Sequence, residues 1–341
     1  MNKDHPFKSV RNSVFYIAEI GGNHEGNYAY AQQLTKLAIE SGADVVKFQF
    51  YSGDTLVSRH EDRERNDHFK KFELSKEQNL KLIRMVEGGG AIPMASLWSK
   101  EMVNWADQYF TIHKVGSGDL TCYPMLAALA ITGKPIILST GLSSLHEVAN
   151  AVKYIENIDA SYISQRKLAL LQCTSTYPTP NEDANIDAML TLKEEFGLPV
   201  GYSDHTLGAD AIEVAVALGA EIIEKHFTDI REGKTFRDHK LSLTCDEVRI
   251  TLDRMRRITT LKGNIEKVLT SSEKESGHLV TFRRGIYAAC DISAGETITS
   301  DNITVLRPAH GLCASRFDEV LGRKSIHDIP MYQPIKEDDL E

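Results

Sequence analysis

The feature that most constrains the fold is a regular alternation of short β-rich runs with longer helical segments between residues 14 and 261. The segments between the runs, such as 28–41 and 145–158, carry apolar residues at helical spacing. Eight strands that alternate with helices predict an α/β fold, a (β/α)8 TIM barrel. The predicted strands are Val14–Glu19, Asp44–Gln49, Ala91–Ser96, Thr111–Val115, Pro135–Ser139, Leu168–Cys173, Pro199–Tyr202 and Glu221–His226.

Glycine positions support the same interpretation. The pairs Gly42-Ala43, Gly133-Lys134 and Gly219-Ala220 stand where a helix should end before the next strand. A doubly wound open sheet would also alternate strands and helices, so it remains the structural alternative. No GxGxxG sequence follows the first strand, which weakens a dinucleotide-binding interpretation.

The pattern changes after Leu261. The polar stretch Thr270–His278 is typical of a linker, and three short β-like runs follow it, namely Gly285–Ala289, Glu296–Thr299 and Ile303–Leu306. The predicted organisation is a barrel over residues 1–268, a linker over 269–281 and a small, mostly β domain over 282–341. A domain of about 60 residues is near the lower limit for an independent core. We therefore expect it to lean on a barrel, its own or a partner's.

Composition excludes several classes of protein. The formal net charge is −9 over 341 residues, which argues against nucleic-acid binding but permits a local anion site. The five cysteines are odd in number and contain no CxxC pair, so a reducing compartment is expected. The N-terminal segment 1–13 has no apolar signal region, and no apolar run reaches about 18 residues. The sequence thus predicts a cytoplasmic protein without a membrane partner.

Polar side chains end nearly every predicted strand. In a TIM barrel the carboxyl ends of the strands form the active site, so these side chains should converge on one mouth. Each of them singly could also be an ordinary cap or loop residue. They are Glu19, Lys47, Gln49, Ser96, Lys114, Ser117, Ser139, Thr140, Ser175, Tyr177, Asp204, His205, Glu224, Lys225 and His226.

Two histidines stand at matching positions on neighbouring strands. His205 follows the seventh predicted strand and His226 ends the eighth, so both imidazoles could bind one divalent cation. A single histidine is more often a hydrogen-bonded structural residue. His24, in GGNHEG, is interpreted in that way, as a residue that orients its own loop.

Two lysines end the second and fourth predicted strands. Lys47 and Lys114 should face water or an anion, because a buried ammonium group without compensation is costly. The hydroxyl groups and glycines after the fourth and fifth strands would complete a phosphate or carboxylate cradle. The alternative is a Schiff-base lysine, which would need a desolvated amine with a lowered pKa.

The sequence runs that contain these residues resemble, in their order and spacing, those of the sialic acid synthase family over nearly the whole chain. The C-terminal runs RRGIYAACDISAGETITSDNI and LRPAHGL resemble the antifreeze-like (SAF) domain of that family. The barrel motifs are IAEIGGNHEGN, DVVKFQFY, HKVGSGDLT, PIILSTGLSS, LLQCTSTYPTPNEDANI, VGYSDHTLG and IIEKHFT.

The resemblance implies a fold, an activity and an assembly. It implies a barrel with a SAF domain, in a domain-swapped homodimer where the small domain of one subunit reaches over the other's active site. It implies an enzyme that condenses phosphoenolpyruvate with an N-acyl amino-sugar aldehyde, of the N-acetylmannosamine type, and water. The products would be a nonulosonic (sialic) acid and phosphate, and the cofactor would be a divalent metal ion, manganese or magnesium.

The resemblance also implies roles for individual residues. Glu19 matches the carboxylate that orients or deprotonates the attacking water. His205 and His226 match the metal ligands. The phosphoenolpyruvate contacts would be Lys47, Ser96, Lys114, Ser117, Ser139 and Ser175, and the sugar contacts Gln49, Tyr177, Asp238 and Arg307.

The sequence departs from the family pattern mainly near the expected sugar site. Asp119, Ser175 and Ser96 replace residues of similar hydrogen-bonding character. The segment Thr228–Leu243, in contrast, begins with an unusual charged stretch before Asp238, which we call the charged lead-in. The acceptor sugar is therefore open, and a legionaminic or pseudaminic acid synthase that uses a 6-deoxy diacetamido sugar is the main alternative. A Schiff-base aldolase and a carbohydrate- or ice-binding module on an inert barrel are the remaining ones.

Overall fold

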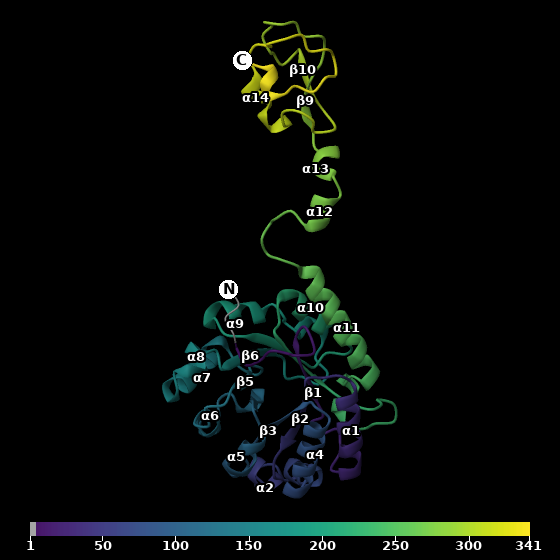
Figure 1. Cartoon of the computed structure of the whole chain (residues 1–341). Coiled ribbons are helices and arrows are strands. Elements are labelled where there is room, and N and C mark those ends of the chain that lie inside the picture. Colours follow the sequence, from purple (N-terminus) through teal and green to yellow (C-terminus); the bar gives the residue numbers. More distant parts are fainter. Residues whose placement is uncertain (1–4) are drawn as a thin grey trace. The chain divides into compact units, whose positions relative to one another are not determined.

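The computed structural model describes residues 5–341, so the first four residues of the N-terminal segment considered above lie outside it. The chain divides into two compact units, of which the first ends at Gly263 and the second comprises Asn264–Glu341 (Figure 1). Each unit is described by itself.

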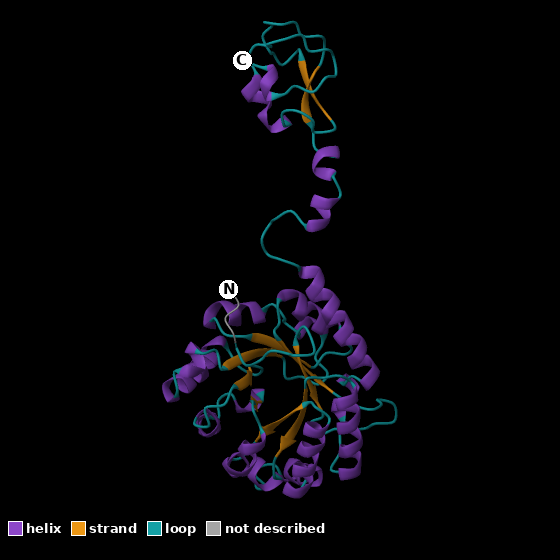
Figure 2. Ribbon diagram, in the orientation of Figure 1, coloured by secondary structure: helices purple, strands orange, loops and turns teal. Residues whose placement is uncertain are grey.

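The first unit is a closed barrel of eight parallel strands in sequence order, surrounded by helices (Figure 2). Strand β1 pairs with β8 as well as with β2, which closes the sheet and brings Glu19 opposite both Lys47 and His226. The TIM barrel is thereby confirmed and the open sheet is excluded. The strands are β1 (Phe15–Glu19), β2 (Val45–Phe50), β3 (Ile92–Leu97), β4 (His113–Val115), β5 (Ile136–Ser139), β6 (Leu168–Cys173), β7 (Val200–Asp204) and β8 (Ile222–His226).

Helices connect successive strands, and their ends follow the local capping chemistry. Ser75 and Ser144 open α4 and α7 through capping boxes with Gln78 and Glu147. Gly219 adopts a left-handed φ of 103° after α10, as expected of a glycine that ends a helix. The helices of this unit are α1 (Tyr28–Glu40), α2 (Gly53–Leu56), α3 (Arg63–Phe72), α4 (Lys76–Gly88), α5 (Lys100–Ala106), α6 (Tyr123–Ala130), α7 (Leu145–Ile158), α8 (Ser161–Ser164), α9 (Ala188–Phe196), α10 (Asp210–Leu218) and α11 (Cys245–Lys262). Short 3-10 turns are η1 (Asp107–Tyr109), η2 (Ser117–Asp119), η3 (Asn181–Asp183) and η4 (Arg237–Leu241).

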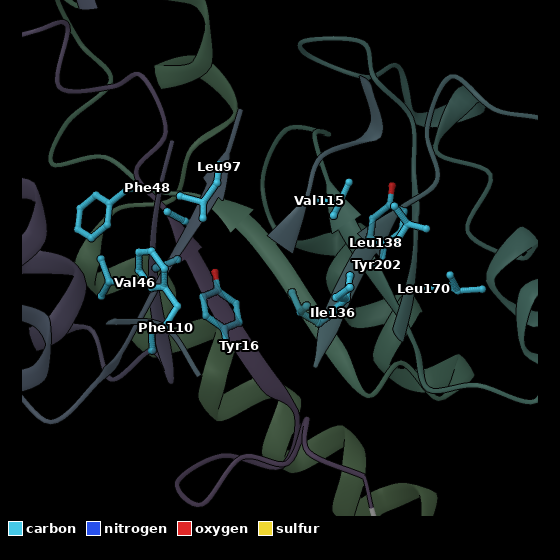
Figure 3. Close-up of a cluster of buried hydrophobic side chains, with 14 of the residues drawn as sticks. Tyr16, Val46, Phe48, Leu97, Phe110, Val115, Ile136, Leu138, Leu170 and Tyr202 are labelled. Carbon is cyan, nitrogen blue, oxygen red and sulfur yellow. The ribbon is translucent and has the colours of Figure 1, made fainter. Parts of the chain in front are cut away.

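The barrel wall separates two apolar cores because strand side chains alternate between its faces. Tyr16, Val46 and Leu138 belong to the larger cluster outside the wall, under the helices, part of which Figure 3 shows. The smaller cluster lies inside the barrel and comprises Phe7, Phe15, Ile17, Val45, Met94, Ile112, Ile137, Ala169, Leu171 and Ile222. This alternation decides which polar side chains reach the interior.

The second unit has an apolar core of its own, which includes Ile286, Ile298 and Ile335. Its two strands, β9 (Gly285–Ala288) and β10 (Ile303–Leu306), pair in antiparallel fashion. The predicted strand 296–299 is wrong: Thr297 makes only an isolated bridge to Lys324, and the other three residues belong to no strand. The predicted linker 269–281 contains two short helices. The helices and turns are α12 (Ser271–Glu275), α13 (His278–Thr281), α14 (Phe317–Val320), η5 (Ala314–Arg316) and η6 (Glu337–Asp339).

Within residues 5–341, none of the helices has both the length and the apolar character needed to cross a membrane.

Candidate active site

A cavity of about 1260 Å3 opens at the carboxyl ends of the barrel strands. Its polar lining follows from strand alternation, because Glu19, Lys47 and Lys114 each lie two residues beyond a member of the inner apolar cluster. The cavity brings together every barrel residue that the resemblance assigns to the site: Glu19, Lys47, Gln49, Ser96, Lys114, Ser117, Ser139, Ser175, Tyr177, His205, His226 and Asp238.

Three of the polar residues at the strand ends do not line the cavity. One is Thr140, whose Oγ1 donates to the Leu171 carbonyl at 3.0 Å. The other two, Asp204 and Lys225, each precede one of the two histidines, so alternation turns them to the other side of the barrel wall. There Lys225 Nζ lies 2.6 Å from Asp204 Oδ2 in a fully buried ion pair, and it also donates to the Thr206 carbonyl. The expectation that all the strand-end groups converge on one mouth is therefore wrong for these three residues.

Four buried charges form an alternating chain within the cavity. Lys47 Nζ lies 2.7 Å from Glu19 Oε2 and 3.4 Å from Glu224 Oε2. Lys114 Nζ lies 3.6 Å from Glu224 Oε1 and donates to Ser139 Oγ at 2.7 Å. The order Glu19–Lys47–Glu224–Lys114 gives each ion a neighbour of opposite sign, which compensates for its burial.

The two carboxyl groups of this chain have different pKa values. Burial raises the pKa of Glu19, and the nearby Glu224 charge adds to the rise while Lys47 opposes it. Burial acts in the same direction on Glu224, but Lys114 and Lys47 outweigh it and lower the pKa of that carboxyl to about 2. Two carboxyl groups with pKa values pushed apart can take different roles. Glu19 is the candidate proton acceptor, and Glu224 remains an ionised partner for two lysines.

Hydroxyl groups and a backbone amide lie beside Lys114. The amide of Gly141 donates to Ser117 Oγ at 3.1 Å. A Cβ at position 141 would lie 2.6 Å from Ser175 Oγ and 2.8 Å from Ser117 Oγ, so a residue with a side chain would displace both hydroxyls. A cation, hydroxyl donors and a close backbone form a set of groups suited to a phosphate or carboxylate.

The two histidines face each other with ring centroids 5.5 Å apart. His205 Nδ1 lies 2.8 Å from the Thr174 carbonyl, so this nitrogen donates a hydrogen bond there and Nε2 is the ring nitrogen left for a ligand. His226 Nδ1 is buried without a hydrogen-bond partner, 3.9 Å from Asp238 Oδ2. Burial holds the pKa of His226 well below its ordinary value, with the nearby His205 acting in the same direction, so the imidazole is neutral.

These imidazoles fit a divalent metal ion. Neutral imidazole nitrogens are metal ligands, and a buried nitrogen without a partner is costly unless something binds it. Between residues 5 and 341, no group of three or more histidine, cysteine, aspartate or glutamate side chains has a metal-binding arrangement. The protein would therefore supply two ligands, and water or substrate the rest. His24 has the loop role expected of it, since its Nδ1 accepts from the Gly26 amide at 3.1 Å.

The rim near the histidines contains a residue that the sequence analysis did not identify. Tyr177 packs on His205 with ring centroids 4.1 Å apart, and the Arg237 guanidinium lies 4.3 Å from the centre of the Tyr177 ring. Arg237 Nε also donates to Asp238 Oδ1 at 2.8 Å. The only signal in the sequence was its place beside Asp238 in the charged lead-in.

An aromatic wall on the α3 side was also missed. His68 and Phe72 lie 4.3 Å apart, and Phe72 lies 5.0 Å from Phe236, between ring centroids. All three line the cavity. No pattern in the sequence indicated this wall, because α3 lies within the connection between the second and third strands rather than at a strand end.

Arg307, the remaining residue assigned to the sugar, belongs to the second unit. It directly follows β10 and its side chain is exposed.

Comparison with known proteins decides the family. A sequence model of the NeuB family matches residues 34–267, and one of the SAF domain matches residues 283–341. The chain belongs to the NeuB family. The resemblance to the sialic acid synthases is thereby confirmed, as is the presence of a SAF domain.

Named relatives of this NeuB family member are synthases of nonulosonic acids. It is 34% identical over 320 residues to the N,N'-diacetyllegionaminic acid synthase of Campylobacter jejuni, covering 90% of this chain and 94% of that one. It is 33% identical to the pseudaminic acid synthase of the same species, covering 96% and 97%. The crystal structure of the N-acetylneuraminic acid synthetase of Leptospira borgpetersenii, in complex with citrate, superposes with a TM-score of 0.72 at 31% identity, covering 78% and 90%. The protein is thus an enzyme, a nonulosonate synthase that forms a carbon–carbon bond.

Proposed function

We propose that the protein condenses phosphoenolpyruvate with the open-chain aldehyde of an N-acyl amino sugar and with water, giving a nonulosonic acid and phosphate. The observation that carries this proposal is the buried chain Glu19–Lys47–Glu224–Lys114 beside two facing imidazoles in one cavity. An anion site, a proton acceptor and a metal site in one enclosure are what this condensation requires.

The anionic substrate would bind around Lys114. Its ammonium group and the hydroxyls of Ser117, Ser139 and Ser175 can donate to the phosphate and carboxylate oxygens. When phosphate leaves, the same donors stabilise the charge that it carries away. Lys47 and Ser96 would complete this contact set.

Glu19 would act on the water. The new carbon–carbon bond joins the enol carbon of phosphoenolpyruvate to the aldehyde carbon, and water then adds to the phosphate-bearing carbon. A carboxylate with a raised pKa can orient that water and take its proton near neutral pH. Gln49 holds the carboxyl in place, because its Nε2 donates to Glu19 Oε1 at 2.8 Å.

His205 and His226 would hold the divalent ion, manganese or magnesium. When bound, such an ion supplies Lewis-acid polarisation of a carbonyl oxygen. Tyr177, beside His205, and Asp238, beside His226, would then border the sugar.

The acceptor has two candidates. An N-acetylmannosamine-type sugar is the first, and the relationship to an N-acetylneuraminic acid synthetase supports it. A 6-deoxy diacetamido sugar, as in legionaminic or pseudaminic acid synthesis, is the second. The apolar rim formed by Phe72 and Phe236 favours the second candidate, because it suits a methyl group better than a hydroxymethyl group.

Phosphate release from phosphoenolpyruvate, measured with each acceptor and with none, tests the proposal. Release should require an acceptor sugar, and mass spectrometry should show a product that combines both carbon skeletons. Borohydride should trap no substrate adduct, since no Schiff base forms. Acceptor-independent release or a trapped lysine adduct would contradict the condensation.

Metal removal tests the proposed role of His205 and His226. Exhaustive chelation should abolish phosphate release, and Mn2+ or Mg2+ should restore it. His226→Ala should lose Mn2+ binding by calorimetry while its circular dichroism stays unchanged. His146→Ala, at an exposed position on α7, is the control and should bind Mn2+ normally. Full turnover after chelation would remove the metal from the proposal.

A further inference from the structure

Arg237 is a rim guanidinium for which the family resemblance implies no role. It opens η4, the turn that follows β8, and it lines the cavity with 62% of its side chain exposed. Of its donors, Nε is bonded to Asp238 Oδ1, and among residues 5–341 the two Nη groups have no hydrogen-bond partner. Arg237 thus has donors to spare at the rim of the cavity.

The segment that carries Arg237 is anchored on both sides. Before it, Arg231 makes a bidentate pair with Glu247, with both N–O distances 2.6 Å. After it, His239 Nδ1 lies 2.7 Å from Thr228 Oγ1. The charged lead-in that distinguishes this sequence is therefore held against the barrel, and it fixes the backbone from which Arg237 extends.

The side chain is held as well as the backbone. Its guanidinium stacks on the Tyr177 ring, 4.3 Å from the ring centre, and this contact restricts the side chain. The bond to Asp238 restricts the plane of the guanidinium group. Both contacts are to residues of the proposed sugar site, so the free Nη groups lie where the acceptor would be bound.

The charges at the rim decide what kind of group these donors suit. Asp238 Oδ1, 2.8 Å from Arg237 Nε, offsets part of the Arg237 charge. Glu61, Asp62 and Glu64 also line the cavity, together with Arg65, so the acidic groups outnumber the basic one among these four residues. An anionic phosphate group would be repelled by this excess of negative charge, whereas an uncharged carbonyl oxygen would be affected much less. The Nη groups therefore suit an uncharged hydrogen-bond acceptor.

We propose that Arg237 determines acceptor specificity by donating its Nη hydrogens to the carbonyl oxygen of an N-acyl group on the sugar. The inference rests on the proposed function and narrows its acceptor. If Arg307 serves one N-acyl group, as the family resemblance implies, Arg237 provides for a second. The acceptor class is then a neutral amino sugar with two N-acyl groups.

The test compares three acceptors: N-acetylmannosamine, its 6-phosphate and a 6-deoxy di-N-acetyl amino hexose. The wild-type enzyme should show the highest kcat/KM with the di-N-acetyl sugar. Arg237→Met should raise the KM for that sugar by about 10- to 100-fold, the loss expected for a hydrogen bond from a charged donor. The preference for two N-acyl groups over one should therefore disappear. The KM for phosphoenolpyruvate should not change, because Arg237 does not contact that substrate in the proposed arrangement.

Control variants separate specificity from structure. Arg237→Lys keeps the charge but not the planar fork, so it should recover only part of the preference. Arg254→Met, at an exposed arginine on α11 paired with Glu213, should leave all three sugars unaffected. An equal loss for all three sugars, no loss, or a wild-type preference for the 6-phosphate would overturn the inference. Failure of every sugar to support phosphate release would instead count against the proposed function itself.

Discussion

At the scale of single residues, two buried glutamates of the enzyme differ in pKa because their neighbours differ. Glu19 has one lysine partner, at 2.7 Å, whereas Glu224 lies between two lysines and also accepts from Ser203. Their pKa values move in opposite directions for that reason. In the proposed mechanism, the same residue type thus supplies both a proton acceptor, Glu19, and a permanent counter-charge, Glu224.

We predict that Glu19→Gln lowers kcat by a factor of about 10² to 10⁴, the usual contribution of a general acid–base group. The amide cannot take a proton from water, but it has nearly the shape of the carboxyl. Phosphoenolpyruvate binding, measured by calorimetry, should therefore change much less than kcat. Glu213→Gln, on α10, is the control and should turn over normally. Near-normal turnover of Glu19→Gln would remove Glu19 from the chemistry.

The raised pKa of Glu19 also predicts a pH dependence. Only the ionised carboxylate accepts a proton, and that form is lost as the pH falls through the pKa of the group. Because burial raises this pKa above the ordinary 4.5, the acidic limb of the kcat profile should lie above 4.5. The limb should be absent from the residual activity of Glu19→Gln. A wild-type limb at or below 4.5 would contradict the assignment.

Individual residues were predictable from sequence where strand alternation decides their direction. Glu19, Lys47 and His226 sit at strand ends on the inner face, and the sequence analysis named all three. No lysine or arginine lies beside Glu19 in the sequence. In space, Lys47 lies against Glu19, because β1 and β2 pair Glu19 with Lys47 across the sheet. Such a contact depends on strand register, which the sequence alone does not define. Arg237 was missed because the direction of its side chain depends on the conformation of the loop after β8.

At the scale of elements, a buried ion pair connects the ends of β7 and β8, next to the two histidines in sequence. Asp204 and Lys225 are opposite each other in the β7–β8 ladder, and Thr206 N donates to Asp204 Oδ1 at 2.8 Å. The pair therefore joins the ends of the two strands from which His205 and His226 extend. If either side chain is removed, the other keeps its hydrogen bond to Thr206 but loses the one ion-pair partner it has within residues 5–341.

We predict that Lys225→Met lowers the free energy of unfolding by about 3–5 kcal/mol, because it leaves Asp204 buried and unpaired. The double variant Asp204→Leu/Lys225→Met should recover most of this loss, since apolar pairs of similar volume often replace buried ion pairs without cost. Both tryptophans, Trp98 and Trp105, lie in the first unit, so their fluorescence during urea unfolding reports on the barrel. A double variant as unstable as the single one would contradict this account.

Elements were predicted best where periodicity is strong. All eight barrel strands were identified within two residues of their ends, and α7 (Leu145–Ile158) was predicted with its exact bounds. The helix α3 gave no comparable signal, and it carries His68 and Phe72 of the aromatic wall that was missed. In the small domain, Ile298 is buried in the core but lies outside any strand. There a run of β-branched residues, Thr297 to Thr299, was mistaken for a strand.

At the scale of the whole molecule, the residues that the family resemblance assigns to the sugar belong to two compact units. Gln49, Tyr177 and Asp238 belong to the barrel, and Arg307 belongs to the unit Asn264–Glu341. That unit buries an apolar core of its own, and Arg307 is exposed on it. Its arginine can serve its own barrel or that of a second subunit, and the family resemblance favours the second in a domain-swapped homodimer.

Complementation distinguishes these arrangements. We predict that Arg307→Ala raises the KM for the acceptor sugar and leaves the KM for phosphoenolpyruvate nearly unchanged, because only the sugar loses a donor. In a swapped dimer, mixing Arg307→Ala with Glu19→Ala should restore activity, since one barrel of each mixed dimer then combines an intact Glu19 with the other chain's Arg307. Equimolar random exchange would make about a quarter of all sites intact. If Arg307 served its own barrel, each chain of a mixed dimer would still lack one of the two groups. No recovery of activity, in subunits shown by mass spectrometry to exchange, would therefore contradict the swapped arrangement.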